Sequence, residues 1–144
     1  IHFIDLAAYL IQSPIESIYT TGTKHNPKND IVTIQLTFQD GSTSTINYFS
    51  NGHKSYPKET ITVFYDGKIL TINNFLTTTG YGISNFKKYK TMKQDKGFSQ
   101  LYESFFNSII TGTEFDISKE DIFNHTKASF LAFDSLISSE IKYL

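Results

Sequence analysis

The stretch from residue 31 to residue 50, IVTIQLTFQDGSTSTINYFS, constrains the fold of this chain more than any other. Large apolar residues alternate with polar ones in its first half, which is typical of a strand with one buried face. The apolar positions are Val32, Ile34, Leu36 and Phe38. Asp40-Gly41 then provides turn residues before a second alternating run. The stretch is therefore predicted to form a β-hairpin.

The length of the turn decides which side chains face the core, because a shift of one residue turns every side chain to the other face. A two-residue turn at Asp40-Gly41 would place Ile34 opposite the polar Asn47. A loop one residue longer, with Gly41 left-handed, places Ile34 opposite Ile46 instead. Burial favours this bulged version, which has one apolar face and one threonine-rich face. Such a second face is either wetted or covered by a partner.

Three stretches are predicted to be helical: residues 1–11, residues 98–111, and a stretch that starts after the capping residue Ser118. Apolar side chains form a stripe along each of the last two. The stripes are Phe98, Leu101, Tyr102, Phe105, Phe106, Ile109 and Ile110 on the first of these, and Ile122, Thr126, Phe130, Phe133, Ile137 and Ile141 on the second. We expect both stripes to pack on the apolar face of the sheet.

Further strands are predicted over residues 15–23 and in a second hairpin over residues 59–75. In that hairpin a two-residue turn at Asp66-Gly67 places Val63 opposite Leu70. Polar stretches without a regular pattern, over residues 22–29 and 77–96, are predicted to be loops. Together the elements predict an α+β fold for a single domain, with a mostly antiparallel sheet, helices packed on one face and an open second face.

The composition excludes several classes of function. All 13 basic residues are lysine, and the net charge is -1, so the chain lacks the arginines and the positive field that favour nucleic-acid binding. The absence of cysteine removes disulfides, thiol catalysis and cysteine-bound zinc, and it fits a reducing cytoplasm. No apolar run reaches the roughly 18 residues of a membrane-spanning helix, so neither a nucleic acid nor a membrane is expected as a partner.

His2 and Asp5 lie three positions apart in the first predicted helix and so share one of its faces. A carboxylate beside an imidazole fixes the tautomer of the ring, and this makes an oriented base. The same spacing also describes an ordinary surface pair. The other three histidines, His25, His53 and His125, do not have the spacing of metal ligands. They are predicted to be structural or exposed.

Five lysines crowd the predicted loop before the helix at residues 98–111. They are Lys87, Lys88, Lys90, Lys93 and Lys96. The run is either an anion-binding segment or a solvated loop face. At the other end, the chain opens on Ile1 and enters a helix without a capping residue. We therefore expect it to be part of a longer protein.

Four segments resemble a known family, in the same order and over nearly the whole chain. They are HFIDLAAYLIQSPIESIYT, LTFQDGSTSTINYFSNG, YPKETITVFYDGKILTINNF and QDKGFSQLYESFFNSIITGTEFDIS. They resemble the C-terminal domain of the Gfo/Idh/MocA oxidoreductases, the relatives of glucose–fructose oxidoreductase and inositol dehydrogenase. The resemblance implies an N-terminal Rossmann domain, absent from this chain, that binds NAD or NADP. It also implies that the open sheet face forms a homodimer and that a sheet edge completes the substrate pocket.

The resemblance also implies roles for four residues. His2 matches the catalytic histidine, which exchanges a proton with the hydroxyl group of a sugar-like substrate while hydride passes to the nicotinamide. Asp5, Lys58 and Lys96 match positions expected to bind the substrate. The parent protein would be a cytoplasmic dehydrogenase, and this chain alone would be inactive because the cofactor site lies elsewhere. The alternative is a non-catalytic binding or oligomerisation module of the same fold.

Overall fold

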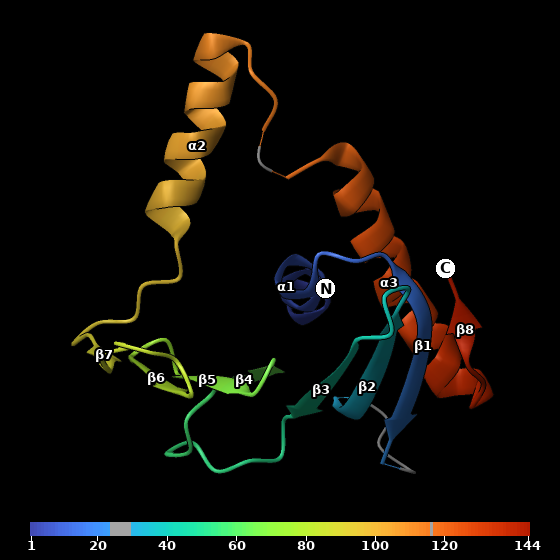
Figure 1. Cartoon of the computed structure of the whole chain (residues 1–144). Coiled ribbons are helices and arrows are strands. Elements are labelled where there is room, and N and C mark those ends of the chain that lie inside the picture. Colours follow the sequence, from blue (N-terminus) through green and yellow to red (C-terminus); the bar gives the residue numbers. More distant parts are fainter. Residues whose placement is uncertain (24–29, 116) are drawn as a thin grey trace. The chain divides into compact units, whose positions relative to one another are not determined.

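The computed structural model describes residues 1–23, 30–115 and 117–144, which form two compact units (Figure 1). Unit 1 comprises Ile1–Gly52 and Asp116–Leu144, and unit 2 comprises His53–Phe115. Most of the loop predicted over residues 22–29, including His25, lies outside the described residues. The α+β class is confirmed, and the described residues form three helices and two open antiparallel sheets.

Unit 1 contains one sheet and two helices. The elements are α1 (His2–Ile11), β1 (Ile15–Gly22), β2 (Ile31–Phe38), β3 (Thr43–Phe49), α3 (Lys119–Ser138) and β8 (Lys142–Tyr143). The strands lie in the order β3-β2-β1-β8, and neighbouring strands are antiparallel (Figure 1). Ser118 caps α3 as predicted, because its hydroxyl oxygen accepts a hydrogen bond from the N–H of Asp121 at 2.9 Å.

The register of the first hairpin is the bulged one. Ile34 lies opposite Ile46 and Val32 opposite Tyr48, as the burial argument requires. The N–H of Phe38 donates to the carbonyl of Ser42 at 2.9 Å, which closes the loop. Gly41 has a φ of 85°, in the left-handed region that glycine adopts without steric cost. Turn chemistry and burial thus select the same register.

The conformation of Gly41 predicts a loss of stability for Gly41→Ala. No described atom lies within 4 Å of the added Cβ, so the cost comes from the backbone alone. We expect unit 1 to lose about 1 to 2 kcal/mol of unfolding free energy, measured by denaturant unfolding. Gly52→Ala is the matched control, since Gly52 has no left-handed φ and its added Cβ meets only a carbonyl oxygen at 3.8 Å. Equal losses in the two variants would contradict this account.

The core of unit 1 lies between the sheet and the helices α1 and α3. Its fully or almost fully buried apolar residues are Ile4, Ala7, Ile15, Ile18, Leu36, Phe38, Ala128 and Ala132. The opposite face of the sheet carries Thr33, Gln35, Thr43, Thr45 and Asn47, and none of these is buried. Thr33 donates across the strands to the side-chain oxygen of Asn47 at 2.9 Å. The predicted apolar face and open polar face are both present in this sheet.

The buried face of α3 differs from the predicted one. The predicted large residues Ile122, Phe130, Phe133, Ile137 and Ile141 are all more than half exposed. The helix instead turns Ala128, Ala132 and Ser135 toward the sheet, and all three are buried. Small side chains win because they let the helix approach β1 closely. The sequence prediction was based on the spacing of large apolar side chains, so it did not identify this face of small residues.

Contacts at the far end of α3 show how close that approach is. A Cβ on Gly22 of β1 would stand 2.8 Å from a methyl carbon of Leu136. The Ser135 hydroxyl accepts the N–H of Thr20 at 2.9 Å and donates to the carbonyl of Glu140 at 2.6 Å. One buried hydroxyl thus joins β1, α3 and the segment that leads into β8. These bonds satisfy backbone groups that the tight packing takes away from water.

Unit 2 contains the second sheet and one helix. The elements are β4 (Thr60–Tyr65), β5 (Lys68–Asn73), β6 (Thr77–Tyr81), β7 (Tyr89–Lys90) and α2 (Phe98–Thr111). The strand order is β4-β5-β6-β7, and Val63 lies opposite Leu70 as predicted for a two-residue turn. β6 and β7 occupy part of the stretch predicted to be irregular. The sequence did not predict β6, because its run of threonines has no alternation of apolar and polar residues. Pairing with β5 defines this strand instead.

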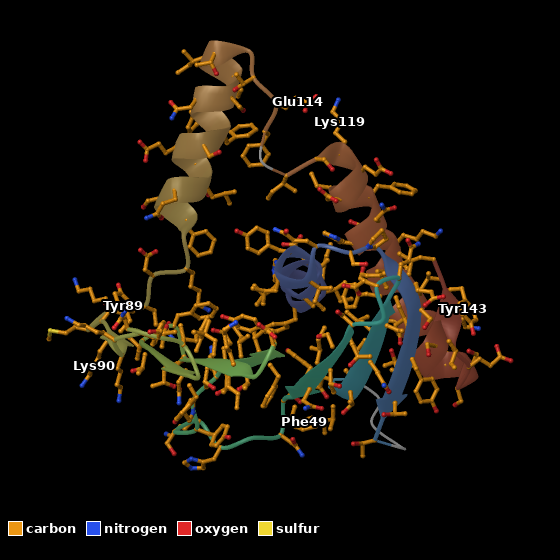
Figure 2. All side chains as sticks on the ribbon, in the orientation of Figure 1. Phe49, Tyr89, Lys90, Glu114, Lys119 and Tyr143 are labelled. Atoms are coloured by element: carbon orange, nitrogen blue, oxygen red, sulfur yellow. The ribbon has the colours of Figure 1, made fainter. Side chains whose placement is uncertain are left out.

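The strands therefore form two hydrogen-bonded sheets, where the sequence predicted one. The polar turn segment between β3 and β4 interrupts the ladder. Helix α2 begins at Phe98 and ends before Gly112, as predicted, yet none of its residues is buried. Within unit 2, the apolar stripe of α2 is therefore not buried on the sheet of that unit. The two residues of β7, Tyr89 and Lys90, are also exposed, and their side chains project into solvent (Figure 2).

Candidate functional site

The most distinctive polar contact of unit 1 joins its two helices. Nδ1 of His125 on α3 lies 2.8 Å from Oδ1 of Asp5 on α1. The His125 side chain is only 13% exposed, whereas that of Asp5 is 50% exposed. The carboxylate thus has one oxygen held by a shielded ring, and the rest of the group remains accessible. Asp5 makes no other side-chain hydrogen bond within the described residues.

His2 lies on the same helix as Asp5, one turn earlier, and is exposed. Its imidazole makes no hydrogen bond or ion pair in the part of the chain that the structure describes. The partner of Asp5 is therefore His125 and not the sequence neighbour His2. Spacing along one helix identifies side chains that share a face, but it gives no information on what a second helix brings to that face.

The sequence reasoning missed His125, and the fold explains how it reaches the site. His125, Ala128, Ala132 and Ser135 are separated by three, four and three positions, which places them on one face of α3. The two alanines of this set pack in the core against α1 and the sheet. The same packing carries His125 to the start of α1. A signal was present, because His125 continues the small-residue face of α3 by one turn.

The arrangement is suited to binding and deprotonating a hydroxyl group. A carboxylate accepts hydrogen bonds from hydroxyl groups, and an imidazole within reach takes up a proton near neutral pH. His2 and Asp5 both project from the first turns of α1, on the accessible part of unit 1. Within the part of the chain that the structure describes, α1 thus carries an imidazole without a partner, His2, and an oriented carboxylate, Asp5, one turn apart.

The two lysines predicted to bind substrate belong to unit 2. Lys96 donates to both carboxylate oxygens of Glu59, at 3.0 and 2.9 Å, and its Nζ lies 5.4 Å from the centre of the Phe75 ring. Glu59 is 19% exposed, so this ion pair is partly shielded. Lys58 precedes Glu59 and is exposed. The charge of Lys96 is already compensated, which leaves Lys58 as the more available cation of the two.

A strained turn supports the Lys96 ion pair. Asn74 and Phe75 have φ values of 51° and 52°, a left-handed conformation that is unusual for a bulky residue. The side-chain amide of Gln94 donates to the carbonyl and the side-chain oxygen of Asn74, both at 2.8 Å. The N–H of Asn74 donates to the carbonyl of Glu59 at 2.6 Å. These bonds hold the turn in place, and the Asn73-Asn74 pair was its sequence signal.

The described residues contain neither a metal cluster nor a membrane-spanning helix. Residues 1–23, 30–115 and 117–144 contain no group of three or more His, Cys, Asp or Glu side chains placed to hold a metal ion. Over the same ranges, no helix has both the length and the apolar character needed to cross a membrane.

Comparison with known proteins gives matches among solved structures. A scan of protein-family models finds no match, and neither does a search of curated proteins. The aldose-aldose oxidoreductase of Caulobacter crescentus matches 99% of this chain with a TM-score of 0.78 at 15% identity. An oxidoreductase of Agrobacterium radiobacter in complex with NAD+ and L-tartaric acid gives the same three values. The myo-inositol 2-dehydrogenase of Lactobacillus plantarum matches 99% of the chain with a TM-score of 0.64 at 14% identity.

The likeness covers one part of each of these proteins. The chain spans about half the length of the oxidoreductases it matches, with 45% of the Caulobacter protein and 46% of the other two covered. At these identities the likeness establishes the fold, and it extends over nearly the whole chain. This chain has the fold of the C-terminal part of Gfo/Idh/MocA-type oxidoreductases, as its sequence resemblance predicts.

Proposed function

We propose that this chain is the C-terminal, substrate-binding and dimerisation part of a cytoplasmic NAD(P)-dependent dehydrogenase that acts on a hydroxyl group of a sugar or sugar derivative. The observation that carries the proposal is the fold match over 99% of the chain to enzymes named for aldose and inositol oxidation and reduction. The accessible His2 and the held Asp5 on α1 supply the acid–base and hydroxyl-binding groups that such a reaction needs.

In the proposed reaction the chain's own residues bind the substrate and move one proton. The Asp5 carboxylate accepts a hydrogen bond from a substrate hydroxyl group, and a ring nitrogen of His2 takes the proton of the hydroxyl being oxidised. Lys58 and Lys96, which belong to unit 2, remain proposed substrate-binding residues through their ammonium groups. Each role follows from the kind of donor or acceptor that the residue offers. The hydride acceptor, when bound, is a nicotinamide ring.

The residues of this chain do not fit a nucleotide site of their own. The sequence has no glycine-rich turn between a strand and a helix, the motif that cradles a dinucleotide pyrophosphate. NAD or NADP would thus be held mainly by a domain outside this chain.

An activity assay on the intact protein tests the proposal. A panel of sugars, inositols and nucleotide-linked sugars is incubated with NAD+ or NADP+, and formation of the reduced nicotinamide is followed by absorbance. We expect turnover with at least one polyol, and none from residues 1–144 alone. An intact protein that binds these compounds without oxidising any of them would favour a non-catalytic binding module.

The open face of the unit 1 sheet is the proposed dimer interface, and a single charge tests it. Thr45 is exposed on that face, opposite Gln35. In a symmetric dimer, Thr45→Glu buries two like charges, so we expect the dimer dissociation constant of the intact protein to rise about 100-fold or more. Analytical ultracentrifugation over a concentration series measures it. Ser99→Glu adds the same charge in the first turn of α2 and should leave the dimer intact; equal weakening by both variants would reject this interface.

A further inference from the structure

The contact between His125 and Asp5 reaches across 120 positions of sequence and is well protected on the histidine side. His125 stands one turn before Ala128, which is fully buried in the core with Ala132. The position of the His125 ring is therefore restrained, since neighbouring residues of the same helix are fixed by packing. Asp5, by contrast, is half exposed and would rotate freely without this bond.

The two ends of this contact have different capacities for hydrogen bonds. A carboxylate offers two oxygens, and the ring of His125 occupies Oδ1 of Asp5. The other oxygen has no hydrogen bond within the described residues, so it stays available to a ligand. An imidazole that donates through Nδ1 makes a charge-assisted hydrogen bond, which holds Oδ1 of the carboxylate in place.

We propose that His125 is the positioning residue of the candidate site: it donates from Nδ1 to Oδ1 of Asp5 and so aims the second carboxylate oxygen at a substrate hydroxyl group. This inference rests on the proposed function. It adds a residue from α3, at the other end of the chain, to a site otherwise made by α1. Preorganisation of this kind strengthens substrate binding because the bound rotamer is already in place.

Two variants of the intact dehydrogenase test the role of the donor. His125→Phe keeps the ring but removes the donor, whereas His125→Asn keeps a donor at nearly the position of Nδ1. We expect His125→Phe to lower kcat/KM about 10- to 100-fold, mainly through the KM of the polyol, because hydrogen bonds to charged groups are worth about 1.5 to 3 kcal/mol. His125→Asn should recover most of this loss. The KM of the nicotinamide cofactor should not change in either variant.

A double-mutant cycle with Asp5→Ala shows whether His125 acts through Asp5. In the Asp5→Ala background, His125→Phe should cause no further loss of kcat/KM. Nitrogen NMR of the chain itself gives a readout independent of activity. The Nδ1 resonance of His125 should show that this nitrogen carries a hydrogen, and it should shift when Asp5 is replaced by asparagine. The thermal midpoint of each variant shows how much of any loss comes from unfolding.

The outcomes separate this inference from the function on which it rests. If His125→Phe retains full kcat/KM while His2 variants lose turnover, the dehydrogenase stands and the positioning role is overturned. The role is equally overturned if the loss persists in the Asp5→Ala background, or if His125→Asn loses as much as His125→Phe. An intact protein with no dehydrogenase activity on the polyol panel overturns the proposed function, and the positioning role with it.

Discussion

If the intact protein is the proposed dehydrogenase, replacing His2 by asparagine is expected to lower its kcat by about 100-fold or more, because general acid–base groups contribute roughly 10²- to 10⁴-fold to rate. Asparagine keeps a polar side chain of similar size but cannot take up the hydroxyl proton. His2 is exposed and has no hydrogen-bond partner within the described residues, so the fold should not depend on it. Steady-state kinetics should show a large fall in kcat and an unchanged KM for the cofactor.

His53→Asn is the matched control for His2→Asn. His53 is also exposed, and within the described residues its ring is hydrogen-bonded only to the nearby Ser55, at 2.8 Å from that hydroxyl. We expect this variant to turn over at the wild-type rate. A wild-type rate in His2→Asn would remove His2 from the catalytic role, whatever the control does. An equal loss in both variants would point to a general sensitivity of the enzyme and not to a specific base.

The largest expected effect on stability comes from Phe38→Ala. Phe38 is 0% exposed, and it belongs to the same core as Leu36, Ile18 and the alanines of α3. Removing a buried phenylalanine ring costs about 3 to 5 kcal/mol, through lost burial and the cavity left behind. Hydrogen exchange followed by mass spectrometry should show much faster exchange in peptides from β1 and β2. Peptides from unit 2, whose sheet has its own hydrogen bonds, report separately on that unit.

Phe130→Ala provides the control for this core substitution. Phe130 lies on α3, two positions after Ala128, but its side chain is 67% exposed. We expect its loss to change the unfolding free energy of unit 1 by no more than about 0.5 kcal/mol, as is usual for surface substitutions. A large effect of Phe130→Ala, together with a small effect of Phe38→Ala, would mean that the burial of β2 and α3 described above is incorrect.

Local patterns in the sequence predicted the local structure well. The two hairpin registers follow from turn residues and from the pairing of apolar side chains within a few positions, as with Ile34 and Ile46. The start of α3 follows from Ser118 for the same reason, since a cap acts within one turn of its helix. In each case the residues that decide the outcome are close together in the chain.

Contacts between distant segments could not be predicted in the same way. The size of Phe130 and Phe133 suggested that they face the core, yet close packing of α3 on β1 selected Ala128 and Ser135. The partner of Asp5 was hidden for the same reason, because it depends on how α3 crosses α1. The division into two sheets also depends on which strands find partners, and alternation within one strand does not specify this.

The outward-facing aromatic rings of α2 and α3 have a practical consequence for handling this polypeptide. Side chains such as Phe106 and Phe133 stand more than half exposed to water. Exposed apolar patches of this kind promote self-association and non-specific binding to other molecules in the preparation. Recombinant preparations of residues 1–144 should therefore stay monodisperse only at low concentration or with a mild detergent. Co-expression with the nucleotide-binding domain that the proposed function requires is the better route to crystals.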